Sequence, residues 1–153
     1  GVLAAGAITR LMSGKTDVIQ MLNGAIGGLV AITAEPLMPS PLAAILIGAI
    51  GGIIVVFGTK LLFSLKIDDV VGAVPAHLFA GIWGTLAVPL TNGDASFGAQ
   101  LLGVISINAF VFVVSLIVWG IMKGTMGIRL SKEAERLGTD VTESGVIAYA
   151  IRD

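Results

Sequence analysis

The chain alternates long uncharged apolar runs with short polar connections. The uncharged runs cover residues 18–34, 36–59, 70–93 and 95–122. Each reaches or exceeds the roughly 17 to 25 residues that an α-helix needs to cross the hydrocarbon of a bilayer. Residues 1–9 form a further apolar piece that is too short to cross by itself. The pattern therefore predicts four complete transmembrane helices and the end of a fifth.

Glycine, proline and polar residues mark where these helices should end. The connections read RLMSGKTD (10–17), EPLMPSP (35–41), TKLLFSLKIDD (59–69) and TNGDAS (91–96). The fold class that we expect is all-α, a polytopic helical membrane protein. Its spans should lie roughly at residues 1–12, 18–34, 42–64, 69–90 and 97–124.

Composition supports a membrane protein and excludes several other classes. Hydrophobic residues make up 56% of the chain and charged residues 12%, and the mean hydropathy is +0.99, which is too apolar for an ordinary soluble domain. The chain has no cysteine, so no disulfide framework or thiolate metal site is expected. The net charge of −1 offers no basic surface for nucleic acid. We expect neither a cofactor nor enzymatic chemistry.

Basic residues occur on alternate connections, as the positive-inside rule requires of successive short loops. The second and fourth connections contain neither lysine nor arginine. The first and third connections and the segment after Met122 should therefore be cytoplasmic, which suggests a protein of the plasma (cytoplasmic) membrane. The basic residues that support this orientation are Arg10, Lys15, Lys60, Lys66, Lys123, Arg129, Lys132 and Arg136.

The C-terminal segment differs in composition from the rest of the chain, because charges of both signs are mixed in it. We predict a transmembrane bundle over residues 1–126 and a solvated cytoplasmic tail over 127–153. Within the tail, Ser131 can cap a short helix whose first turn contains Glu133, and Gly138 can end it.

His77 is the only histidine, and it lies in the apolar stretch DDVVGAVPAHLFAGIWGTLA (68–87). The carboxylates of Asp68 and Asp69 suit the positive end of a helix dipole, so we expect the helix to begin there. Eight residues rise about 12 Å, which places the imidazole near the middle of a hydrocarbon layer about 30 Å thick. Ionisable groups at that depth usually mark a substrate, ion or proton path, whereas the plainer alternative is a hydrogen bond between helices. Burial disfavours the imidazolium, so a neutral ring is expected.

The helical face of His77 should be lined with small residues. Counting by three and four places Ala73, Ala80, Gly81 and Gly84 on that face, which leaves room for a partner helix or a narrow lumen. Pro75 has no N–H, so the carbonyl of Val71 should lack its helical donor. Glycines four residues apart in the preceding spans, Gly24 with Gly28 and Gly48 with Gly52, predict close helix packing.

Four segments, in order, resemble the ammonium transporter family (Amt/Mep/Rh). IDDVVGAVPAHLFAGIWGTLAV (67–88) is similar to the penultimate helix of the family, where a DD pair opens the helix and a histidine follows. NGAIGGLVAITA (23–34), IGAIGGIIVVFGTKLLFSLKIDD (47–69) and GIRLSKEAERLGTDVTESG (127–145) resemble two earlier segments and the cytoplasmic tail. The resemblance implies a fold of about eleven transmembrane helices, of which this chain would supply the last four and a half. The absence of an initiator methionine and of a signal-peptide pattern agrees with a piece of a larger protein.

The resemblance also implies roles for particular residues. His77 would be the second of two pore histidines, Thr33 would lie near the path, and Ala73 would face it. The family's first histidine, phenylalanine gate and external recruitment site belong to helices outside this chain. Leu78 and Ser144 depart from the glycine and histidine that are usual there. The residues expected in a regulatory tail are Arg129, Glu133, Gly138 and Asp140.

The function implied is transport of ammonium or ammonia through a hydrophobic pore. A neutral His77 would hydrogen-bond ammonia and help to relay the proton, which avoids burying a whole charge. The resemblance further implies a homotrimer in the lipid bilayer, with a PII-type signalling protein as a partner at the cytoplasmic face. Two alternatives stay open: an ammonium sensor built on the same bundle, and a structural membrane subunit in which His77 bonds between helices.

Overall fold

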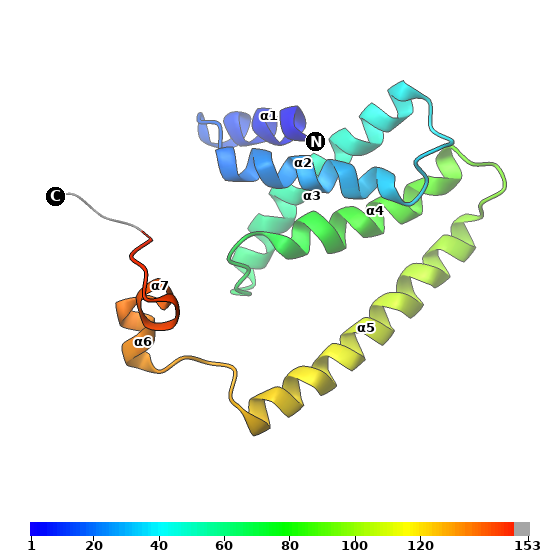
Figure 1. Ribbon diagram of the computed structural model, residues 1–153. Helices are drawn as coiled ribbons and strands as arrows, with labels where there is room; N and C mark the ends of the chain where they lie inside the picture. The colour runs from blue at the N-terminus through cyan, green and yellow to red at the C-terminus, as the bar shows by residue number, and fades with distance from the viewer. Residues whose placement is uncertain (149–153) are drawn as a thin grey trace. The chain divides into compact units, whose positions relative to one another are not determined.

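The computed structural model describes residues 1–148, and every regular element within that range is a helix (Figure 1). This confirms the all-α class. By its contacts the chain divides into two compact units, Gly1–Asn108 and Ala109–Asp153. The helices of the first unit are α1 (Val2–Ser13), α2 (Val18–Thr33), α3 (Pro41–Ser64), the π-helix η1 (Val74–Phe79), α4 (Ala80–Ala87) and the 3₁₀-helix η2 (Val88–Leu90). The helix α5 (Phe97–Thr125) extends across the division.

Two of these helices, α3 and α5, are long and apolar enough to cross a membrane by length and composition. Their best windows have mean hydropathies of 2.5 and 2.7. α1, α2 and the run Val74–Leu90 are apolar but shorter. The observed ends lie close to the predicted ranges except at the start of the fourth span, where the helix begins after residue 69.

Local capping groups explain where the helices start. Asp17 precedes α2 and accepts a hydrogen bond from the backbone N–H of Gln20 at 3.1 Å. Ser40 precedes α3 and accepts from Ala43 N–H at 3.3 Å, while Pro41 occupies the first turn. The side-chain oxygens satisfy backbone donors that have no partner inside the helix.

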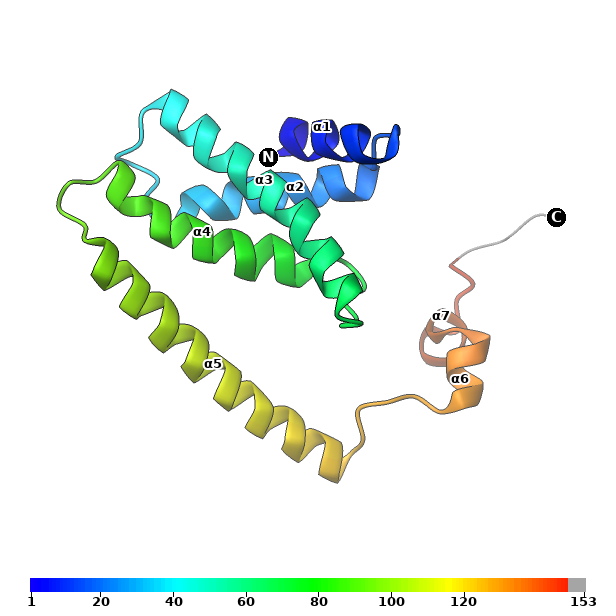
Figure 2. The same cartoon turned by 180° about the vertical axis from the view of Figure 1, so that it is seen from behind.

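α2 is the centre of the first unit and lies against α1, α3 and α4 (Figures 1 and 2). The closest approach uses glycine pairs. A Cβ atom on Gly51 would lie 2.6 Å from the carbonyl oxygen of Gly27, and one on Gly28 would lie 3.1 Å from that of Gly48. Backbones therefore meet with no side chain between them, as small residues permit in membrane helices.

α4 packs against α2 through a glycine and against α3 through a side-chain hydrogen bond. A Cβ on Gly84 would overlap the carbonyl oxygen of Ala31, so α4 touches the backbone of α2 there. The indole of Trp83 donates to the carbonyl oxygen of Ile47 in α3 at 3.0 Å. Around these contacts lies a small apolar core of Ala31, Ile47 and Ala87, with Ile32 and Trp83 packed on it.

The second unit contains the end of α5 and two short helices, α6 (Lys132–Leu137) and α7 (Thr139–Ser144). Ser131 caps α6 by accepting from Ala134 N–H at 3.1 Å, and Gly138 follows its last residue. The expected short tail helix is therefore present, and a second one, α7, follows it directly.

Candidate functional site

The helix that carries His77 begins with a capped turn. The two carboxylate oxygens of Asp69 accept from the N–H groups of Ala73 and Val74, each at 2.9 Å. Gly72 has φ +74°, a left-handed conformation that a right-handed helix cannot include. The helix therefore starts after Gly72, later than the predicted residue 69. Asp68 is exposed and lies beside Asp69 in the preceding loop.

The prediction that Pro75 deprives Val71 of a helical donor needs a correction. Val71 lies before the helix, so its carbonyl is not a helical acceptor of that kind. Pro75 stands in the first turn, where an N–H would have no helical partner in any case. The carbonyl of Val71 instead accepts from the side-chain Nδ2 of Asn23 in α2, at 2.8 Å. This role of Asn23 was not predicted from the sequence.

One face of η1 packs closely on α3. A Cβ on Gly58 would lie 2.6 Å from the ring of Phe79 and 3.0 Å from Cβ of Pro75. Pro75 and Ala76 are buried. π-helical turns are rare and often occur at functional sites.

His77 lies on the exposed side of η1, as does Ala73 at its start. Within residues 1–148 the imidazole makes no hydrogen bond, and the structural alternative stays open. Ala80 and Gly84, which were predicted to share this face, are buried instead. Gly81, by contrast, lines the same cavity as His77, so the count by three and four is confirmed for Gly81 and wrong for Ala80 and Gly84, where the wide π turn has changed the register.

His77 opens onto a cavity of about 310 Å³ within the first unit. One wall comes from η1 and α4 and the other from the first turns of α5. Its polar groups besides His77 are Thr85, Gln100 and Asn108, and Asn108 donates to its own helix at Val104. Thr33 and Ala73 do not line it; Thr33 is exposed at the end of α2 and donates to the Leu29 carbonyl at 2.8 Å. Polar residues inside an apolar run were the sequence signal for Gln100 and Asn108.

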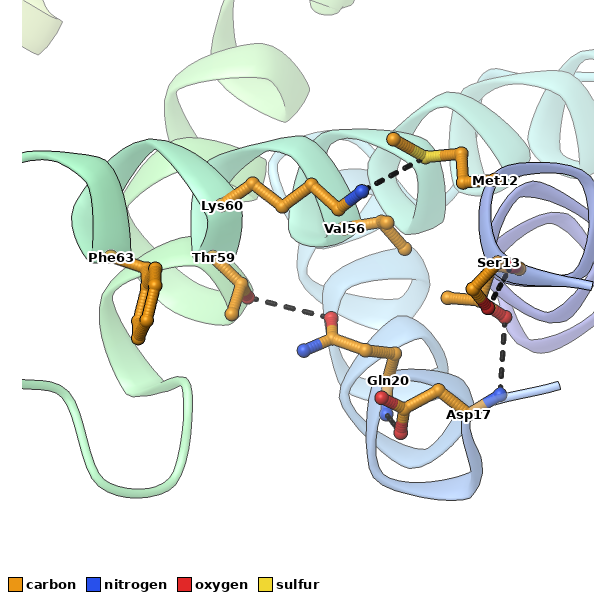
Figure 3. A pocket seen from close by; sticks show the side chains of 9 residues that line it. Met12, Ser13, Asp17, Gln20, Val56, Thr59, Lys60 and Phe63 are labelled. Carbon is orange, nitrogen blue, oxygen red and sulfur yellow. Dashed lines mark hydrogen bonds between the residues drawn. The ribbon is translucent and has the colours of Figure 1, made fainter. Parts of the chain in front are cut away.

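A second cavity, of about 320 Å³, lies among α1, α2 and α3 (Figure 3). Lys60 points its Nζ at the sulfur of Met12, 3.5 Å away, and the Thr59 hydroxyl donates to Gln20 Oε1 at 3.4 Å. Asp17 and Ser13 lie at the opposite wall. None of the predicted site residues lines this cavity.

The predicted tail residues form local contacts in the second unit. Arg129 pairs with Glu135, with 2.7 Å between Nε and Oε1, and this hydrogen bond and the carboxylate charge hold the pKa of Arg129 above its ordinary value. Asp140 accepts from Ala148 N–H at 2.9 Å, which lowers the pKa of its carboxyl. Glu133 is exposed in the first turn of α6 and Gly138 separates the two helices. Glu135, the partner of Arg129, was not predicted.

The apolar helices and their glycine contacts are typical of a helical membrane protein. Among residues 1–148 no group of three or more histidine, aspartate or glutamate side chains could hold a metal ion. The sequence model described as "Ammonium Transporter Family" matches residues 1–149. The chain belongs to the ammonium transporter family.

Known proteins resemble the chain over nearly its whole length. Ammonium transporter Amt2 of Archaeoglobus fulgidus is 37% identical over 97% of this chain and 36% of its own. Ammonium transporter Amt1 of Methanocaldococcus jannaschii is 33% identical over 97% of this chain and 40% of its own. A solved structure named "Sensor Amt Protein" superposes with a TM-score of 0.86 at 28% identity, covering 94% of this chain and 38% of that one. The chain thus spans little more than a third of these relatives.

These matches confirm the family resemblance and the membrane-protein class. The relatives are named as transporters, so the chain belongs to a transport family and not to an enzyme family. The predicted roles of individual residues stay predictions.

Proposed function

We propose that the protein containing this chain transports ammonium across a membrane and that His77 lines its path. The observation that carries the proposal is the placement of the lone histidine in a chain of this family. The backbone of η1 is fixed by Asp69 and packed on α3, while the imidazole points away from those contacts toward a cavity.

The chemistry of the side chain suits this role. Carrying a whole ammonium ion through hydrocarbon requires burying an unpaired charge, which is very unfavourable. A neutral imidazole has one donor and one acceptor nitrogen, so it can accept a hydrogen bond from ammonia or ammonium and pass a proton on. In this role His77 binds the cargo and helps to move the proton separately from ammonia.

Thr33 and Ala73 are proposed as further residues of the path. Both are exposed on the first unit, at the end of α2 and the start of η1. The Thr33 hydroxyl donates a hydrogen bond to the Leu29 carbonyl oxygen, and its own oxygen can still accept one from ammonium. Ala73 contributes only space, since a methyl group leaves room beside the imidazole.

The arrangement around this path is also a proposal. Residues 1–126 form the membrane part and residues 127–153 a cytoplasmic tail, in a homotrimer in the plasma (cytoplasmic) membrane. Arg129, Glu133, Gly138 and Asp140 shape the tail as a regulatory contact, and a PII-type signalling protein binds at the cytoplasmic face. The alternation of basic loops supports this orientation.

A sensor is the second candidate, because the superposing solved structure is named as one. Uptake of methylammonium by the full-length protein in membrane vesicles tests both. We expect uptake by the wild type and a loss of about 100-fold or more in His77→Ala, the usual contribution of a positioned proton-transfer group. Absence of uptake by the wild type, with ammonium still bound, would favour the sensor. Unchanged uptake in His77→Ala would favour the structural role.

A further inference from the structure

A side chain of α2 holds the loop before η1. Asn23 is buried, with 9% of its surface exposed, and its Nδ2 donates to the carbonyl of Val71 at 2.8 Å across 48 residues of sequence. The other buried polar side chain of the described chain, Thr9, donates within its own helix to Gly6. The Thr9 hydroxyl oxygen also accepts from the backbone N–H of Asp17, the residue before α2, at 3.2 Å, but that contact spans only eight residues, whereas Asn23 reaches a loop 48 residues away.

The backbone next to Val71 leaves little room around the Asn23 amide. Gly72 follows Val71 in the left-handed conformation, and a Cβ on it would overlap Nδ2 of Asn23. Only a glycine lets the loop turn there and lets the amide come close enough to bond Val71. The amide therefore holds the loop at one residue, immediately before the chain turns into η1.

The capped turn connects this fixed loop to the helical segment that carries His77. Asp69 accepts from the first two helical N–H groups, Ala73 and Val74, and Pro75 rests on Gly58 of α3. His77 follows two residues later. The backbone position of His77 is set by the Asn23–Val71 hydrogen bond before the helix and by the contact of Pro75 with Gly58 of α3.

We propose that Asn23 is a positioning residue for His77, because its amide fixes the start of the π-helical segment. The consequence for transport rests on the proposed function of His77. Asn23 does not touch the cargo; it acts through the backbone of residues 71–77. Since α2 also carries Thr33, the same residue ties the two elements of the proposed path to each other.

Removing the amide donor should disturb the segment selectively. Val71 is 67% exposed, so its carbonyl is expected to accept from water once the amide is removed, and the loop is then no longer held against α2. The glycine contacts of α2 with α3 lie elsewhere on α2, at Gly27 and Gly28, and should survive. The effect should therefore be confined to the loop and η1.

The test uses the full-length protein with Asn23→Asp, which keeps the side-chain volume without the donor, and Asn23→Ala. Hydrogen–deuterium exchange reports on the backbone and methylammonium uptake on function. We expect amide exchange in residues 73–79 to be about tenfold faster, which corresponds to one lost hydrogen bond. The maximal uptake rate should fall by about the same factor while the concentration for half-maximal uptake stays unchanged.

Asn92→Ala is the matched control. Asn92 also donates its side-chain amide across the fold, to Glu35 Oε2 at 3.0 Å, but it joins two loops away from η1. This variant should leave both the exchange of residues 73–79 and the uptake kinetics as in the wild type. If Asn23 only stabilised the fold in general, the Asn23 and Asn92 variants would change amide exchange and uptake to a similar extent.

Unchanged exchange in residues 73–79 of both Asn23 variants would overturn the proposal. So would loss of the folded protein in both variants, because Asn23 would then hold the bundle and not one segment. If exchange rises but His77→Ala leaves uptake unchanged, Asn23 still positions His77 and the transport role of His77 fails. If His77→Ala stops uptake and the Asn23 variants change neither quantity, the positioning role alone fails.

Discussion

The indole N–H of Trp83 in α4 donates to the carbonyl oxygen of Ile47 in α3 at 3.0 Å. That carbonyl lies inside α3, where it also accepts a backbone hydrogen bond of its own helix, so it accepts from both α3 and α4. The bond joins α4 to α3 beside the core of Ala31, Ile47 and Ala87. It is a polar contact between helices whose other contacts are apolar.

Trp83→Phe keeps an aromatic ring and removes this donor. We expect a loss of about 0.5–1.5 kcal/mol in the free energy of unfolding, the usual net value of one hydrogen bond. Reversible denaturation of the purified protein in detergent, followed by circular dichroism, measures it. Trp119→Phe is the control, because Trp119 lies on α5 with 56% of its surface exposed. Equal effects of the two substitutions would show that the Ile47 bond contributes nothing specific.

Gly84→Ala tests the backbone contact between α4 and α2. The added methyl group would overlap the Ala31 carbonyl oxygen, so the helices must separate, at about 1–3 kcal/mol for overpacking. Thermal unfolding of the purified protein should show a lower midpoint. Gly98→Ala provides the comparison, since no atom lies within 4 Å of the corresponding methyl position. A midpoint unchanged by Gly84→Ala would contradict the close approach.

Asp69→Ala removes the cap of η1. Two backbone N–H groups lose their acceptor, and we expect a loss of about 0.5–2 kcal/mol in the free energy of unfolding, as for other N-terminal caps. Asp69→Asn keeps one acceptor oxygen and should be milder. The neighbouring Asp68→Ala should have little effect, because Asp68 is exposed. Denaturant titration of the three variants gives the order, and a larger loss for Asp68→Ala would refute the assignment of the cap.

Asp140 should respond to acid. Its bond from Ala148 N–H lowers the pKa of the carboxyl, so the folded tail holds the ionised form more strongly than an unfolded chain does. The contact is fully present above the ordinary aspartate pKa of about 3.9 and is lost as the pH falls through the lowered value. Carbon NMR of the labelled side chain measures the titration. A midpoint at or above the ordinary value would disprove the contact, and Asp140→Asn should weaken the protection of the Ala148 amide.

The helices themselves could be predicted because they depend on local composition. Uninterrupted apolar runs and capping residues such as Asp17 and Ser40 fix most ends without reference to the rest of the chain. The start of the His77 helix could not be placed in this way. Asp69 suggested a start, but the left-handed conformation of Gly72 delays the helix until after that residue. The sequence does not reveal this conformation, because glycine is compatible with many.

The candidate site was predictable only in part. His77 stood out because an ionisable residue in an apolar run is unusual. Its small neighbours were assigned with an α-helical period, which fails after a π turn, so Ala80 and Gly84 were placed on the wrong face. The bond from Asn23 to Val71 joins residues far apart in sequence, and no local pattern indicates such a pair.

The glycine pairs between α2 and α3 have a consequence for motion. Where Gly27 meets Gly51 and Gly28 meets Gly48, backbone touches backbone, and no flexible side chain lies between them to absorb a displacement. Any hinge or shear between these two helices would have to break several contacts at once. We therefore expect α2 and α3 to behave as one rigid body, so that any conformational change of the protein displaces the two helices together.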